Sequence, residues 1–95
     1  MSMFNLGNSV GGLNLISKTE VADFSSTDHV FSEPCTKGIY VTAPSGGGTL
    51  VCRVREDSAD ISVAFPEGNT YWPFQVSAIR TSGTTTTLKV LGGLF

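Results

Sequence analysis

The sequence has little charge and few histidines and cysteines. Only 15% of the 95 residues are charged, and there are one histidine and two cysteines. Disordered chains usually carry more charge and fewer Val, Ile and Phe, so a folded domain is favoured. A length of 95 residues allows one small domain, which argues against an enzyme of ordinary size.

The chain also lacks a cluster of positive charge. Its six basic residues are scattered, and the net charge is −2. Nucleic-acid binding normally needs a clustered basic face. Only Arg53 and Arg55 have the spacing that places two side chains on one face of a strand, and Glu56, Asp57 and Asp60 follow them. We therefore expect no nucleic-acid partner.

Targeting signals are missing from the sequence as well. No apolar run approaches the roughly 20 residues of a transmembrane helix, so no membrane partner is expected. The first six residues have neither the basic nor the apolar region of a secretory signal. Because the chain begins at Met1, we expect synthesis in the cytoplasm without processing, where a structural disulfide is uncommon.

The two cysteines leave two interpretations open. Cys52 lies between Leu50 and Val54 on the same face of an alternating run, as a small buried apolar residue would. Alternatively, Cys35 and Cys52 could approach each other across neighbouring strands and form a disulfide. Two cysteines and one distant histidine are too few for a structural zinc site.

The sequence contains no catalytic constellation. Asp28 precedes His29 directly, but neighbouring residues of a strand point to opposite faces, so the pair is badly placed to act together. No Gly-x-Ser-x-Gly turn surrounds any serine. The Gly46-Gly47-Gly48 run leads into a strand without the Gly-Lys-Ser/Thr sequence of a phosphate-binding loop. We expect no catalytic, cofactor or metal site.

Alternating apolar and polar residues predict five β-strands after residue 37. The runs cover residues 38–43, 49–55, 60–65, 74–80 and 85–91, bounded by turn-forming Gly, Pro, Asp or Ser. Val, Ile and Thr supply 24 residues against 12 from Ala and Leu, which favours sheet over helix. One or two weaker strands are expected between residues 21 and 36. We predict an all-β fold, a small antiparallel β-sandwich or barrel of about six to eight strands.

The faces of the last two runs can also be predicted. Phe74, Val76 and Ala78 are expected on one face of their strand. Because Ile79 breaks the alternation, we expect one face of this strand to bury a second surface. In the final run, Leu88 and Val90 are expected to point inward. Both assignments follow from the period of two with which side chains alternate between the faces of a strand.

The two ends of the chain differ from its centre. Residues 1–20 show neither a helical nor a strand period, and glycines interrupt their apolar side chains. We predict an extended N-terminal arm over residues 1–20 and a β-sandwich domain over residues 21–95. Docking of this apolar arm on a neighbouring subunit is favoured over a disordered terminus. Leu94 and Phe95 form an apolar tail after a glycine pair that we expect to be flexible.

Several segments between residues 28 and 91 occur in an order that is known from one family. After a Ser-Thr-Asp segment come Lys37-Gly38-Ile39-Tyr40-Val41, a Gly-rich turn with an alternating strand, Val63-Ala64-Phe65-Pro66-Glu67-Gly68, Tyr71-Trp72-Pro73-Phe74-Gln75-Val76 and Thr81-Ser82-Gly83-Thr84-Thr85. This order resembles the head-spike base proteins of tailed phages and of gene transfer agents. The resemblance covers roughly two thirds of the chain, and the first 20 residues have no counterpart in it.

The resemblance implies a non-enzymatic virion structural protein. Such a protein is made in the host cytoplasm, lies on the capsid exterior and attaches a projecting spike or fibre to the head. The implied partners are further copies of the chain, the major capsid protein and the spike or fibre protein.

One alternative is a capsid decoration (cement) protein, which would differ in copy number. Another is a carbohydrate-binding β module in which Tyr71, Trp72 and Phe74 form a stacking platform. In a domain of this size, a single Trp more often belongs to the core or to an interface, so that interpretation of the three rings is favoured.

Nine apolar residues are the candidate assembly contacts. A core of about 75 residues is marginal alone, and symmetric assembly would bury the arm and the tail. The candidates are Phe4, Leu6, Leu13, Leu15, Ile16, Tyr71, Trp72, Leu94 and Phe95.

Overall fold

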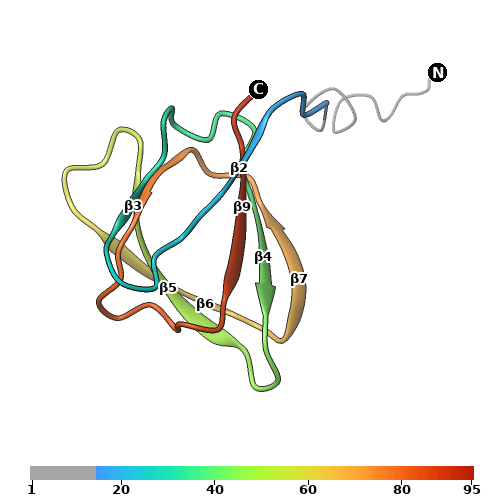
Figure 1. Ribbon diagram of the computed structural model, residues 1–95, viewed down its shortest axis with the longest axis vertical. Coiled ribbons are helices and arrows are strands. Elements are labelled where there is room, and N and C mark those ends of the chain that lie inside the picture. The colour runs from blue at the N-terminus through green and yellow to red at the C-terminus, as the bar shows by residue number, and fades with distance from the viewer. Residues whose placement is uncertain (1–14) are drawn as a thin grey trace.

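The computed structural model describes residues 15–95 of the chain. Phe4, Leu6 and Leu13, three of the expected assembly contacts, lie outside the described residues. No helix in the described part is long and apolar enough to cross a membrane. The described chain is built from β-strands joined by turns and loops (Figure 1).

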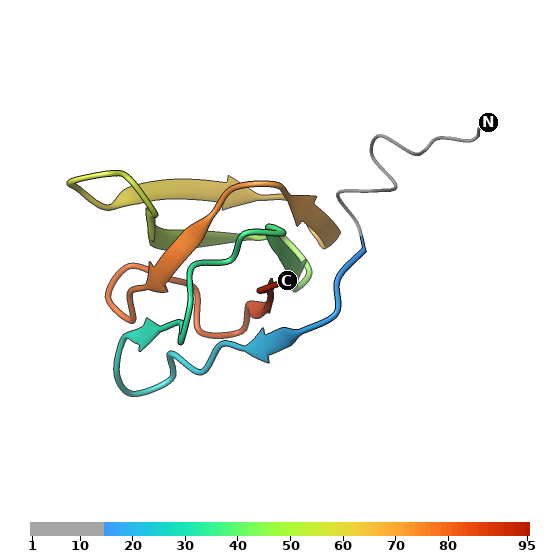
Figure 2. The ribbon, with the colours of Figure 1, turned by 90° about the horizontal axis from the view of Figure 1, so that it is seen from above.

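Eight strands form two four-stranded antiparallel sheets. Their bounds are β2 (Thr19–Val21), β3 (His29–Val30), β4 (Ile39–Ala43), β5 (Gly48–Val54), β6 (Ile61–Phe65), β7 (Gly68–Trp72), β8 (Val76–Ile79) and β9 (Lys89–Gly93). One sheet has the order β2-β9-β4-β7, and the other has the order β3-β8-β5-β6. Figure 2 shows β2 and β6, which belong to different sheets, on opposite sides of the body. This confirms the predicted all-β fold.

The strand order is that of a jelly roll. Only β5 and β6 are consecutive strands that pair within one sheet, and every other connection passes from one sheet to the other. Two interlocked Greek keys produce this arrangement, in which the N-terminal and C-terminal strands lie side by side. Accordingly, β2 pairs with β9, and β9 pairs in turn with β4. Short connections and turn glycines at positive φ, such as Gly46 and Gly83, allow these reversals.

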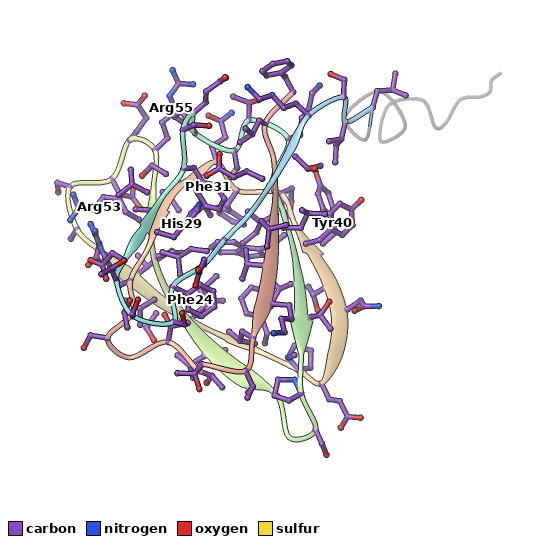
Figure 3. The ribbon with its side chains drawn as sticks, viewed as in Figure 1. Phe24, His29, Phe31, Tyr40, Arg53 and Arg55 are labelled. Carbon is purple, nitrogen blue, oxygen red and sulfur yellow. The ribbon has the colours of Figure 1, made fainter. Side chains whose placement is uncertain are left out.

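The alternation in the sequence accounts for the core. In β4, Ile39, Val41 and Ala43 are buried, while Tyr40 and Thr42 are exposed. The largest fully buried side chains come from both sheets, so the two inner faces share one core. Phe24 and Phe31, from the segment between β2 and β4, are also buried in it (Figure 3). Leu88 and Val90 are buried as predicted.

An irregularity in β8 accounts for the break in alternation at Ile79. Arg53 is paired with Ala78, but the next residue of β5, Val54, is paired with Val76, so β8 contains one extra residue at the bulge. Val76 and Ile79 can therefore both be fully buried although they are three residues apart. Val76 and Ala78 are both buried, whereas Phe74, which was expected on the same face, precedes the strand and is 45% exposed.

The final strand begins later than the sequence pattern indicated. The prediction began the strand at residue 85, but residues 85–88 precede β9, and the side chains of Thr84 and Thr85 bond to the backbone of β5 instead. The Val51 N–H donates to Thr84 Oγ1 at 2.9 Å, and the Thr49 N–H donates to Thr85 Oγ1 at 3.0 Å. A threonine run therefore closes one edge of β5 through its hydroxyl groups.

The C-terminal glycine pair lies within β9 rather than in a flexible tail. Gly92 is paired with Glu20 of β2 and with Ile39 of β4. A Cβ atom at Gly92 would come within 2.7 Å of both Cys35 Sγ and Phe31 Cε1. Glycine is needed here because the side chains of Cys35 and Phe31 occupy the space that a Cβ atom at position 92 would take.

Burial in this core can be tested with two valines. Val76→Ala should lower the free energy of unfolding by about 2 kcal/mol, because it removes two fully buried methyl groups and leaves a cavity. Val30→Ala is the matched control, since Val30 is 69% exposed and its loss should cost less than about 0.5 kcal/mol. Chemical denaturation measures both, and equal losses for the two variants would contradict this core.

Candidate assembly surface

The outer face of the β2-β9-β4-β7 sheet carries a continuous apolar row. Val21, Leu91, Tyr40 and Tyr71 are paired in register, one from each strand of the sheet. Val21 is 72% exposed and Tyr40 is 39% exposed. The rings of Tyr40 and Tyr71 are 4.8 Å apart between centroids and tilted by 38°. Cross-strand neighbours of this kind contact one another directly, so they form one surface.

A groove of about 330 Å³ runs beside this row. It is lined by Val21, Ala22, Tyr40, Thr42, Lys89, Val90 and Leu91. Lys89 is the only charged residue in the lining, and there is no carboxylate. The Thr42 hydroxyl donates to Asn69 Oδ1 at 2.8 Å, so one of the few polar groups is already satisfied. Figure 3 shows Tyr40 on the β4 side of the molecule, away from Arg53 and Arg55.

Tyr71 is fixed at the edge of this surface by its own hydroxyl group. The hydroxyl donates to the Lys37 carbonyl at 2.6 Å. Burial raises the pKa of Tyr71, and the nearby Tyr40 phenol adds to that effect. The phenol is therefore a neutral hydrogen-bond donor to its own chain. The side of its ring remains available for apolar contacts.

Trp72 does not share a face with Tyr71. The two residues are neighbours in β7, so their side chains point to opposite faces. Trp72 packs against the core, stacks on Phe74 at 4.2 Å between ring centroids and meets Phe65 edge-on at 5.9 Å. Tyr71, Trp72 and Phe74 therefore do not form one flat platform for a sugar ring.

The expected contact at Leu94 is corrected by its burial. Leu94 is only 1% exposed and belongs to the core of its own chain. Its N–H donates to the Lys18 carbonyl at 2.8 Å, and this bond extends the pairing of the two chain ends beyond β9. Leu94 is thus unavailable to a neighbouring chain.

Exposed apolar side chains remain at the end of the molecule where the two termini meet. Phe95 is 49% exposed, and its carbonyl accepts hydrogen bonds from the N–H groups of Ser17 and Lys18. Leu15 is 75% exposed, whereas Ile16 is partly buried against Gly93. Figure 1 shows the C-terminus and the segment that leads into β2 at the same end.

The short strand β2 is held in place by a carboxylate as well as by β9. Glu20 Oε2 accepts a hydrogen bond from His29 Nε2 at 2.7 Å, and Oε1 accepts one from the Ser32 hydroxyl at 2.7 Å. The Asp23 N–H donates to His29 Nδ1, so the ring proton is on Nε2. The Ser32 hydrogen bonds lower the pKa of Glu20 most, partly opposed by burial, and His29 lowers it further.

This network ties strands together and is not arranged for catalysis. Ser32 and His29 both donate to one carboxylate, whereas a catalytic serine would donate to the histidine. Asp28 lies elsewhere, since it accepts the Thr81 N–H at 2.7 Å and pairs with Arg80 at 3.4 Å. The sequence adjacency of Asp28 and His29 therefore has no chemical role.

Asp60 and the two cysteines are also accounted for by local contacts and burial. Arg53 and Arg80 both contact Asp60 at 3.1 Å. Burial raises the pKa of Asp60, but the hydrogen bonds from the two guanidinium groups outweigh it and lower the pKa. Cys35 and Cys52 are free and buried, and burial raises their thiol pKa values to about 12 and about 11. Within residues 15–95, no group of His, Cys, Asp and Glu could hold a metal ion.

Sequence reasoning identified Tyr71 but missed its three partners in the row. Tyr40, Val21 and Leu91 lie on three other strands, far from Tyr71 in sequence. Only the order of the strands brings these residues together. No local signal could have indicated that β2 and β9 are adjacent.

Comparison of the chain with protein-family models, with curated proteins and with solved structures gave no match.

The Glu20 network predicts a pH-dependent contribution to stability. Glu20→Gln should lower the denaturation midpoint at pH 7, because a neutral amide replaces the charged acceptor of two hydrogen bonds. The folded state lowers the pKa of Glu20 below its ordinary value of 4.5. Its stabilising effect is therefore present above that pH and is lost as the pH falls through the folded pKa, so the two proteins should converge toward about pH 3.

Glu33→Gln is the matched control for this measurement. Glu33 pairs with Lys18 at 3.4 Å, and both side chains are 46% exposed. A surface pair of this kind contributes little, so the control should resemble the parent at both pH values. A Glu20→Gln deficit that is as large at about pH 3 as at pH 7 would contradict the role assigned to the carboxylate.

Proposed function

We propose that this chain is a non-enzymatic virion structural protein on the exterior of a phage capsid, where it forms the base that attaches a projecting spike or fibre to the head. The observation that carries the proposal is the apolar row of Val21, Leu91, Tyr40 and Tyr71 on the outer face of one sheet. Such a face is costly to expose to water and is typical of a surface that another protein covers.

Two further points support an assembly role. Viral capsid domains are among the proteins that use the jelly-roll arrangement of two sheets, although the same fold also occurs in lectins and cupins. The sequence between residues 28 and 91 resembles head-spike base proteins. The proposed partners are further copies of the chain, the major capsid protein and the spike or fibre protein.

The two alternatives differ in support. A cement protein would use the same outer face and would differ in copy number, since it would cover the shell instead of selected positions. A sugar-binding module receives less support, because Trp72 is packed against the core and stacked on Phe74. Stacking on a sugar requires an accessible aromatic face.

The proposal can be tested with particles that carry this gene. The chain should sediment with intact particles and be labelled by antibody on their outside. Particles made without it should contain filled heads that lack the projecting spike, and the wild-type gene supplied in trans should restore the spike. Counting copies per particle by quantitative mass spectrometry distinguishes a spike base from a cement protein.

Two results would contradict the proposed function. One is a chain that is absent from purified particles while their spikes remain in place. The other is a shift in Trp72 fluorescence when glycans are added, together with specific glycan binding. Val30→Glu is the control variant for complementation. It adds a charge to an exposed position on the other sheet, so it should restore the spike as the wild-type gene does.

A further inference from the structure

The groove beside the apolar row lacks an occupant among residues 15–95. Val21, Leu91 and Tyr40 all line it and are paired in register across three neighbouring strands. The lining is apolar except for Thr42 and Lys89. A hollow of this kind is filled best by a narrow apolar segment, because packing to protein density requires side chains that enter it.

The same face of a second copy is a poor occupant. Two identical faces packed around a twofold axis would place groove against groove, and each hollow would remain unfilled. A projecting strand or arm avoids this problem. It can also leave the Tyr71 ring, which does not line the groove, available to a further protein.

The chain itself contains a segment with the required chemistry. Residues 1–14 lie outside the described part of the structure, and the first charged residue of the sequence is Lys18. The apolar side chains of this segment are Met1, Met3, Phe4, Leu6, Val10 and Leu13. A groove without carboxylates offers no partner to a positive charge, and burial of an unpaired charge is costly. The side chains of residues 1–14 meet neither difficulty, because none of them is charged.

Direction and reach favour a groove on another copy. The chain enters the described structure at Leu15, beside the C-terminal Phe95, and β2 then runs from Thr19 toward the groove at Val21. To fill its own groove, the segment would have to reverse at this point and run back over β2. Fourteen extended residues span up to about 50 Å, whereas the longest dimension of the Cα trace is 44 Å. The segment is therefore long enough to reach an adjacent molecule.

We propose that the groove formed by Val21, Tyr40 and Leu91 binds residues 1–14 of a neighbouring copy. The contact is head-to-tail, so repeated contacts close into a ring when the rotation allows. The inference rests on the proposed function in that the same outer face serves assembly. It names the partner of the groove as a second copy of this chain.

A photo-cross-linking experiment identifies the occupant directly. The full-length chain carries p-benzoylphenylalanine in place of Tyr40, and chains with light and heavy nitrogen isotopes are mixed before illumination. The first tryptic site follows Lys18, so the N-terminal segment is released as one peptide, residues 1–18. We expect cross-links between position 40 of one isotope and peptide 1–18 of the other.

The possible outcomes separate the occupants. Cross-links to peptide 1–18 that never mix isotopes show a segment folded back on its own chain and overturn the proposal. Cross-links to any other peptide of the chain, or no cross-link in a protein that remains monomeric up to its solubility limit, also overturn it. Purified protein is used without particles, so a negative result would leave sedimentation with particles, the test of the proposed function, unaffected.

Sedimentation of matched variants tests the energetic side of the contact. Val21→Glu should weaken self-association by about tenfold or more, because it places an unpaired charge in the groove. Val30→Glu adds the same charge at a valine of similar exposure, 69% against 72%, on the other sheet. It should leave self-association unchanged, and circular dichroism should show that both variants are folded.

An arm variant completes the comparison. Phe4→Glu combined with Leu6→Glu should weaken self-association as Val21→Glu does. Joining the arm and groove substitutions in one chain should add little further loss, because each removes the same contact. Fully additive losses, or equal effects of Val21→Glu and Val30→Glu, would overturn the proposal.

Discussion

The pairing of β9 with both β2 and β4 is the interaction on which the rest of this structure depends. Among the described strands, β2 pairs only with β9, so the C-terminal strand holds the N-terminal one in the sheet. This insertion requires Gly92, because Phe31 and Cys35 occupy the space that a Cβ atom would take. The bonds from Ser17 and Lys18 to the Phe95 carbonyl extend the same pairing beyond the strands.

The candidate surface is a direct consequence of that arrangement. Because β9 lies between β2 and β4, Val21 and Tyr40 flank Leu91 and continue to Tyr71. The Glu20 carboxylate faces the other way, toward His29 and Ser32, and fastens β2 to the segment around β3. One short strand thus contributes a structural anchor from one face and a wall of the groove from the other, as expected for alternating side chains.

Much of the fold could be predicted from the sequence, but the surface could not. The period of two in β4 and β6 is local, so it was visible without any knowledge of pairing. The bulge opposite Arg53 depends on the register of a neighbouring strand. The threonine run lies outside β9 because its hydroxyl groups bond to the backbone of β5. The burial of Leu94 and the apolar row likewise follow from contacts between the two ends of the chain, which no local pattern encodes.

The central claim is that the outer face of the β2-β9-β4-β7 sheet is covered when the protein is assembled on a particle. Hydroxyl-radical footprinting of the free chain and of the particle-bound chain tests this most directly, since Tyr40 and Phe74 have similar exposure, 39% and 45%, but differ in position. The account predicts strong protection of Tyr40 on particles and little change at Phe74. Unchanged oxidation of Tyr40 in the particle-bound chain would contradict it.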